Sequence, residues 1–302
     1  FQRGMRWGNK ELKFIRPIRW LLALLGESII ELEIDGIKGD RYTFGHRFLS
    51  PGKIEIPKAE EYFSILSEAY CIVNQSKREI TVRKGIEELA EAAGGKISED
   101  SKLFTELIYL AEHPTPLACR FDPSFLELPK EVIVTSMKTH QRFFPVENEN
   151  GVLLPIFLGV RDGLDTHIDS VRRGYERVLS ARLNDAKFFY NEDTKLDLEE
   201  YVPKLKGIVF HEQLGTIFDK TYRLIALSKS IAEKLEYDRN EKANLERAAL
   251  LSKADLVTNM VREFPELQGL MGREYASLSK EDKNTAQAIF EHYLPRFRGD
   301  IL

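Results

Sequence analysis

The sequence has few cysteines and no long hydrophobic run. Cys71 and Cys119 are the two cysteines among 302 residues, and neither belongs to a CxxC pair, which argues against a disulfide framework or a thiolate zinc site. The apolar run at residues 21–25 is far shorter than the roughly 20 residues that a membrane span needs. We therefore expect a cytoplasmic protein that makes no membrane contact.

The signatures of phosphate binding and of common catalytic sites are also missing. The chain contains no GxxxxGK[ST] or GxGxxG loop, no GxSxG elbow, no HIGH or KMSKS segment and no convincing class II synthetase motif. His211-Glu212 begins like a zincin HExxH motif, but Gly215 stands where the second histidine is needed. We predict no catalytic residue, no metal ligand and no cofactor bound by this chain.

Charge of one sign does not dominate, so any attraction to nucleic acid must come from local basic patches. The net charge is -4 at pH 7. Residues 1–20 are the densest basic and aromatic stretch, and two further clusters follow. Cations stand beside Phe143 and Phe144, one of which we expect in the core, and arginines recur on a helix predicted over residues 171–186. The candidate RNA-binding residues are Lys138, His140, Arg142, Arg172, Arg173, Arg177 and Arg182. A solvated, charged helix face is the alternative reading of the arginines.

The hydrophobic periodicity predicts an α+β fold in two parts. Residues 1–200 are expected to form a mixed region with an antiparallel sheet, with strands near residues 29–34, 43–48, 133–137, 142–146 and 153–160 and helices over 78–93 and 102–111. Asp35-Gly36 and Asn150-Gly151 are predicted hairpin turns. Residues 201–302 are expected to be all helical, with helices over 222–235, 245–261 and 285–293.

One of these predicted helices is similar to the metal-binding helix of HD-type phosphohydrolases. In those proteins an apolar run precedes a His-Asp pair that holds a metal, and here Ser252 and Lys253 occupy the pair. Serine is a poor ligand, and a lysine ammonium has no lone pair to donate. The pattern favours an HD-like domain with a degenerate metal site, although an ordinary amphipathic helix also fits it.

Several segments, taken in order, resemble the beta subunit of the two-subunit bacterial glycyl-tRNA synthetase over nearly the whole chain. They are residues 5–8 (MRWG), 14–20 (FIRPIRW), 43–48 (TFGHRF), 137–144 (MKTHQRFF), 176–189 (ERVLSARLNDAKFF), 253–256 (KADL), 263–269 (EFPELQG), 291–293 (EHY) and 295–296 (PR). Their joint order makes the resemblance specific. Because the chain lacks an initiator Met and stops soon after a predicted helix, we expect a central fragment, with the helical domain truncated at its C-terminal end.

The resemblance implies a division of labour between two subunits. A smaller alpha subunit would carry the class II active site and bind ATP, glycine and Mg²⁺, while this chain would bind glycine tRNA and orient its 3′ end. The resemblance also implies the HD-like helical domain, and it places the anticodon-binding region outside this fragment. The alternatives are an HD-type metal-dependent phosphohydrolase and a non-catalytic structural assembly protein.

Overall fold

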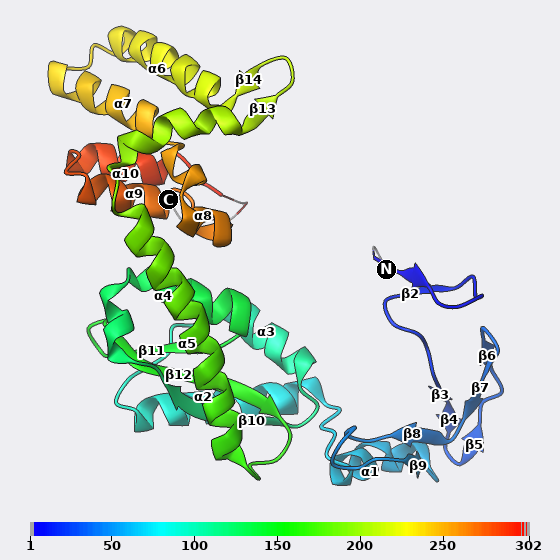
Figure 1. The fold of residues 1–302 in the computed structure, drawn as a ribbon. Helices are drawn as coiled ribbons and strands as arrows, with labels where there is room; N and C mark the ends of the chain where they lie inside the picture. Colours follow the sequence, from blue (N-terminus) through cyan, green and yellow to red (C-terminus); the bar gives the residue numbers. More distant parts are fainter. Residues whose placement is uncertain (1–2, 297, 299, 301–302) are drawn as a thin grey trace. The chain divides into compact units, whose positions relative to one another are not determined.

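The computed structural model describes residues 3–296, 298 and 300, and its fold is mixed α/β. The chain divides into two compact units, whose elements are labelled in Figure 1. Unit 1 comprises Phe1–Arg120 and Arg142–Glu176, and unit 2 comprises Phe121–Gln141 and Arg177–Leu302. The domain boundary near residue 200 stays a prediction.

Unit 1 begins with short strands, each paired locally. The Asp35-Gly36 hairpin is confirmed, since both residues have positive φ and β6 pairs with β7. The single strand predicted over residues 29–34 is wrong, because the chain changes partners there: β5 pairs with β4, whereas β6 pairs with β7. The elements are β1 (Met5–Arg6), β2 (Lys13–Phe14), β3 (Leu21–Leu22), β4 (Leu24–Leu25), β5 (Ser28–Ile29), β6 (Glu33–Ile34), β7 (Ile37–Asp40), β8 (Tyr42–Phe44), β9 (Lys53–Glu55), η1 (Ala59–Glu61) and α1 (Tyr62–Glu68).

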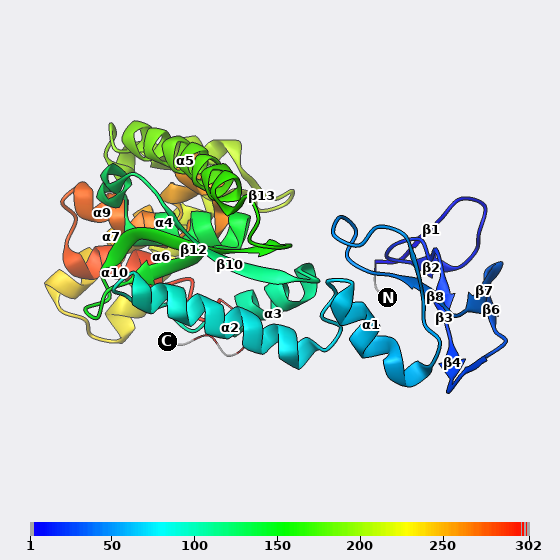
Figure 2. The same cartoon turned by 90° about the horizontal axis from the view of Figure 1, so that it is seen from below.

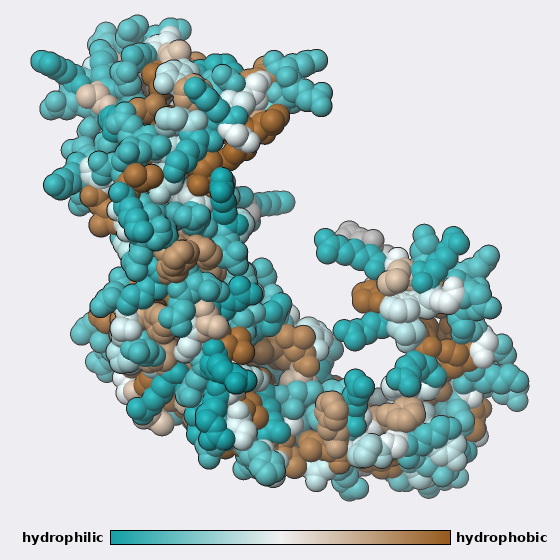
Figure 3. Space-filling view, in the orientation of Figure 1, coloured by the Kyte–Doolittle hydropathy of each residue, from teal (hydrophilic) through white to brown (hydrophobic). Residues whose placement is uncertain are grey.

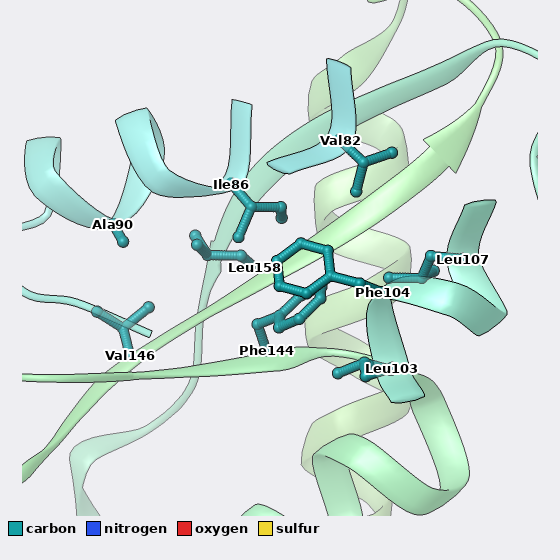
Figure 4. Packing of buried hydrophobic residues seen from close by; sticks show 9 residues of the cluster. All are labelled: Val82, Ile86, Ala90, Leu103, Phe104, Leu107, Phe144, Val146 and Leu158. Carbon is teal, nitrogen blue, oxygen red and sulfur yellow. The ribbon is translucent and has the colours of Figure 1, made fainter. Parts of the chain in front are cut away.

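The main core of unit 1 is a three-stranded antiparallel sheet covered by helices. The strands β10 (Pro114–Arg120), β12 (Leu153–Asp162) and β11 (Phe144–Glu147) lie in that order, and α2 (Gln75–Ala92) lies along β10 (Figure 2). Ile86 of α2, Phe104 of α3 (Ser101–Leu110) and Leu158 of β12 are buried in one apolar cluster (Figure 4). The helices predicted over residues 78–93 and 102–111, the strands predicted over residues 142–146 and 153–160 and the Asn150-Gly151 turn between these strands are confirmed.

The opposite face of this sheet packs against the first part of α5 (Ile168–Asp193). Neighbouring side chains of a strand point to opposite faces, so Phe157 lies on the other side of the sheet from Leu158. The Phe143 ring lies 4.7 Å from that of Phe157 and 5.0 Å from that of Tyr175. Both Phe143 and Phe144 are buried, and neither offers a ring to an RNA base.

The strand predicted over residues 133–137 is wrong. The segment forms α4 (Lys130–Thr135), and one π-helical turn (Ser136–Gln141, η3) follows it. Val132, Ile133 and Met137 are each buried, and the four-residue spacing of Ile133 and Met137 places these two on one side of a helix. The β-branched residues that indicated a strand therefore serve a buried helical turn.

Unit 2 is largely helical, but the expectation of an all-helical region after residue 200 is wrong because β13 pairs with β14 in a short hairpin. The helix predicted over residues 245–261 is interrupted after Leu251, where Asp255 turns inward and accepts hydrogen bonds from the Gly269 and Gly272 N–H groups. No described helix is long and apolar enough to cross a membrane. The remaining elements are η2 (Pro123–Glu127), η4 (Leu198–Gly207), β13 (Val209–His211), β14 (Gly215–Thr216), α6 (Ile217–Lys234), α7 (Arg239–Leu251), η5 (Ala254–Val257), α8 (Asn259–Glu263), η6 (Pro265–Leu267), α9 (Leu270–Leu278) and α10 (Lys283–Glu291).

Candidate nucleic-acid interface

Hydrophilic side chains cover most of the face shown in Figure 3, as the 30% of charged residues leads one to expect. Charge alone therefore does not mark a site, and each predicted cation has to be judged by its partners. A guanidinium or ammonium group already held by a carboxylate must give up that pair before it can bind a phosphate. Exposed cations without such a partner are the better candidates.

Arg172 and Arg173 lie on the part of α5 that belongs to unit 1. Arg172 is an anchor: its Nε donates to the Ala118 carbonyl at 2.9 Å, and its Nη1 is paired with the Asp169 carboxylate. Arg173 is exposed, and its guanidinium group donates to the Ser170 hydroxyl at 3.1 Å and has no ion pair with a described residue. Of these two arginines, Arg173 is the one available to a ligand.

Arg177 and Arg182 lie on the part of α5 that belongs to unit 2. Arg177 is exposed, and its guanidinium group has no hydrogen bond or ion pair with any described residue. Arg182 is paired with Glu263 of α8 at 3.3 Å. Arg173 and Arg177 are thus the two predicted arginines of α5 whose guanidinium groups are not paired with a carboxylate of a described residue.

The second predicted cluster is less accessible than its composition indicates. In unit 2, the His140 ring packs edge-on against Phe264, with centroids 5.4 Å apart, and Nε2 lies 3.8 Å from a Glu266 carboxylate oxygen. Lys138 is half-buried and engaged with the surrounding protein. In unit 1, Arg142 adopts a positive φ of 57° and pairs with Glu106 at 3.2 Å. All three side chains are held by protein contacts.

Unit 2 also contains a basic pocket that sequence reasoning missed. Lys195, Lys204 and Arg262 contribute to a cavity of about 390 Å³. Lys195 is paired with Glu192 at 2.5 Å, Lys204 lies over the Tyr201 ring, and Arg262 is exposed. These residues are spread over almost seventy positions, and no local motif joins them, so only the fold brings them together.

Ser252 and Lys253, at the predicted degenerate metal site, both form hydrogen bonds within the protein. The Ser252 hydroxyl donates to the Ala249 carbonyl at 3.2 Å. The Lys253 ammonium donates to His292 Nε2 at 2.7 Å and lies 3.8 Å from the centre of the Tyr293 ring. Within the described residues, no group of three or more histidine, cysteine or acidic side chains is arranged to hold a metal ion.

Burial shifts the pKa values of Lys253, His292 and Asp255. Desolvation lowers the pKa of Lys253 to about 8, and desolvation together with the nearby Lys253 charge lowers the pKa of His292 to about 4. Desolvation raises the pKa of the buried Asp255 to about 6, although the hydrogen bond from the Gly269 N–H acts in the opposite direction. Near neutral pH the Lys253 ammonium group therefore lies beside a neutral His292 imidazole.

The whole chain is similar to one family of known proteins. A family described as "Glycyl-tRNA synthetase beta subunit" matches residues 1–302. Proteins named glycine–tRNA ligase beta subunit are 52% identical over 302 residues in Clostridioides difficile, 50% identical over 302 residues in Syntrophomonas wolfei and 44% identical over 299 residues in Bacillus subtilis. These alignments include 99–100% of the chain, and the chain spans 44% of each relative's length.

Proposed function

The chain belongs to the glycyl-tRNA synthetase beta-subunit family, and on that premise we propose that it binds glycine tRNA and positions it for a two-subunit glycine–tRNA ligase. The observation that carries the proposal is the identity of 44–52% with proteins of that name over essentially the whole chain. The exposed Arg173 and Arg177 support it, because guanidinium groups form strong, charge-assisted bonds to phosphate oxygens.

In this proposal the chain contributes binding energy and orientation. An alpha subunit in the same cytoplasmic assembly activates glycine with ATP and Mg²⁺, and this chain binds no cofactor. Holding the tRNA so that its 3′ end reaches the partner's active site makes the transfer step effectively unimolecular, which lowers the barrier without a catalytic group on this chain. Phosphate contacts suit that task, since they fix the position of an RNA without reading its sequence.

We further propose that residues 201–302 form an HD-like helical domain that binds and does not hydrolyse. The supporting observation is the Lys253 ammonium, which donates to His292 where an HD-type hydrolase needs a metal-binding pair. A cation cannot ligate a divalent metal and repels it, which disfavours the phosphohydrolase alternative. Domain boundaries at residues 1–200 and 201–302 are part of this proposal.

The experiment is a salt series of tRNA binding with a matched pair of variants. The full-length chain carrying Arg173→Ala and Arg177→Ala should bind glycine tRNA about tenfold more weakly at low salt, because two charge-assisted phosphate contacts are lost. The slope of log affinity against log salt should fall by roughly 1 to 2. Arg239→Ala with Lys242→Ala removes two exposed charges from α7 and serves as the control.

The control variant should keep near wild-type affinity and slope. Equal weakening by both double variants would mean that only diffuse charge matters and would remove α5 from the interface. A folded wild-type protein with no salt-sensitive tRNA affinity would favour the structural assembly alternative.

A further inference from the structure

Unit 1 contains a cavity of about 410 Å³ that the proposed function does not use. Its volume falls within the roughly 300–1,000 Å³ of typical small-molecule sites. The cavity joins two motifs that are distant in sequence, the basic stretch at the N-terminus and the TFGHRF segment. Its chemically distinctive lining residues are Arg19, Trp20, Phe44, Arg47 and Glu112.

Close packing and a buried histidine fix one wall of this cavity. Gly45 lies so near Ala69 that an added Cβ would come within 2.5 Å of the Ala69 Cβ. The next side chain, His46, is 3% exposed, and its Nδ1 accepts hydrogen bonds from the backbone N–H groups of Phe48 and Leu49 at 3.3 and 3.2 Å. The turn that presents Arg47 is therefore held from inside.

The same network holds the opposite wall. Because Nδ1 of His46 accepts, its proton is on Nε2, which lies 3.5 Å from Asp162 Oδ1. That oxygen also accepts from the Glu112 and His113 backbone N–H groups, at 2.9 and 2.8 Å. One carboxylate thus fixes the positions of Arg47 on one side and Glu112 on the other.

The cavity offers aromatic faces and unpaired cations together. Trp20 is 43% exposed and Phe44 is 37% exposed, so neither ring is buried in the core. Their ring centroids are 4.6 Å apart. Arg19 and Arg47 are exposed and have no ion pair with any described residue, although Arg47 lies near the exposed Phe48 ring. Aromatic faces beside guanidinium groups are the elements that bind unpaired nucleotides.

Glu112 narrows the choice of ligand. Its side chain is exposed, and it has no ion pair with a described residue. A carboxylate in the lining repels a bare anion, but it accepts hydrogen bonds from the amino groups of a base or from ribose hydroxyls. A nucleotide has both the negative phosphate and these donors, whereas inorganic phosphate has only the charge to offer the arginines.

We propose that this cavity binds one unpaired nucleotide of an RNA strand. The phosphate contacts Arg19 and Arg47, the base stacks on Trp20 and Phe44, and Glu112 accepts a hydrogen bond from the base or ribose. The base must be unpaired, because a ring can stack on it only when it has left its helix. Identifying that RNA as a tRNA rests on the proposed function, whereas the site itself rests on the cavity.

The test uses the purified full-length chain and a fluorescein-labelled RNA hexanucleotide of mixed sequence. Wild-type protein should bind the single strand and not the same sequence in a duplex. Trp20→Ala and Arg47→Gln should each weaken binding about tenfold, and Trp20→Phe should retain most of the affinity because a ring remains. Phe63→Ala and Arg16→Gln remove an exposed ring and an exposed charge outside the cavity and should change little.

Parallel measurements with glycine tRNA separate this inference from the proposed function. If tRNA binds but the hexanucleotide does not, or if Trp20→Ala has no effect on hexanucleotide binding, the cavity proposal is wrong and the tRNA role stands. Hexanucleotide binding that depends on Trp20 without tRNA affinity would support the cavity and remove the tRNA role. Displacement of the hexanucleotide by equimolar free AMP or CMP would identify a mononucleotide site and overturn the assignment to an RNA strand, and displacement by an equimolar phosphoserine peptide would overturn it in favour of a protein ligand.

Discussion

Asp193, the last residue of α5, is a buried carboxylate that joins three parts of unit 2. It accepts hydrogen bonds from the backbone N–H groups of Asn259 and Met260 at 2.9 and 2.8 Å, and from the Tyr275 hydroxyl at 3.1 Å. Its own carbonyl accepts from the Tyr201 hydroxyl at 3.0 Å. Since the side chain is 1% exposed, water cannot replace the carboxylate for these donors.

We expect Asp193→Ala to lower the free energy of unfolding by about 3 kcal/mol or more, because several buried donors lose their acceptor together. Asp185→Ala, at an exposed position of the same helix, should change it by less than about 0.5 kcal/mol. Urea unfolding followed by circular dichroism measures both. Similar small effects of the two substitutions would contradict a central role for Asp193.

The lowered pKa of Lys253 makes the free energy of unfolding depend on pH. Between its folded pKa of about 8 and its ordinary value of 10.5, the unfolded chain binds more protons than the folded one, so this group makes the protein more stable as pH rises. The gain should be roughly 2 kcal/mol, less than the full shift implies because the side chain keeps some solvent contact.

Urea unfolding at pH 8 and pH 10 should therefore show a gain for wild type that Lys253→Met lacks. Taking the difference between the two proteins removes the contribution of other groups, such as Tyr201, whose pKa burial raises to about 12. Lys242→Met, at an exposed position of α7, should behave like wild type. An identical pH dependence in wild type and Lys253→Met would show that Lys253 is solvated in the folded state.

At this scale, sequence identified residue types but not their partners. The arginines of residues 172–182 are equivalent in pattern, yet Arg172 anchors α5 to β10 and Arg182 pairs with Glu263, while Arg173 and Arg177 remain available. The acceptors lie 54 and 81 residues away along the chain. No local spacing could show them.

Helices were predicted better than short strands. Helices such as α2 and α10 have caps and a sustained apolar face, and those signals are local. The strands near the N-terminus are two to four residues long and exchange partners, so alternation has too few positions to define them. The β-branched residues of α4 indicated a strand because a buried helical turn and a buried strand share composition.

Substitutions at two helical glycines of unit 1 report how tightly their helices pack against neighbouring elements. A Cβ on Gly85 of α2 would come 2.7 Å from the Pro116 ring of β10, whereas a Cβ on Gly174 of α5 meets nothing within 4 Å. We expect Gly85→Ala to cost roughly 1–3 kcal/mol through overpacking. Gly174→Ala should stabilise by about 0.5–1 kcal/mol, because alanine is the better helix former.

Thermal and urea unfolding of the two variants show directly whether each substitution raises or lowers the free energy of unfolding. The matched design matters, since both changes add one methyl group to a helix and differ only in what it meets. Stabilisation by Gly85→Ala would mean that α2 is free to move away from the sheet.

For the whole molecule, family membership was visible in the sequence because it rests on ordered segments throughout the chain, and it is confirmed. The two cavities that gather basic residues were not visible, since each is lined by segments from distant positions. The chain spans 44% of its relatives' length.

The central proposal is that this chain positions tRNA and that a partner subunit activates the amino acid. The most direct measurement compares two activities of the full-length chain assembled with the alpha subunit, using wild type and the Arg173→Ala/Arg177→Ala variant. Glycine-dependent ATP–pyrophosphate exchange should be unchanged, while kcat/KM for charging glycine tRNA should fall about tenfold, mainly through KM. An equal loss in exchange and charging would contradict the account, because these arginines would then act on activation or on assembly.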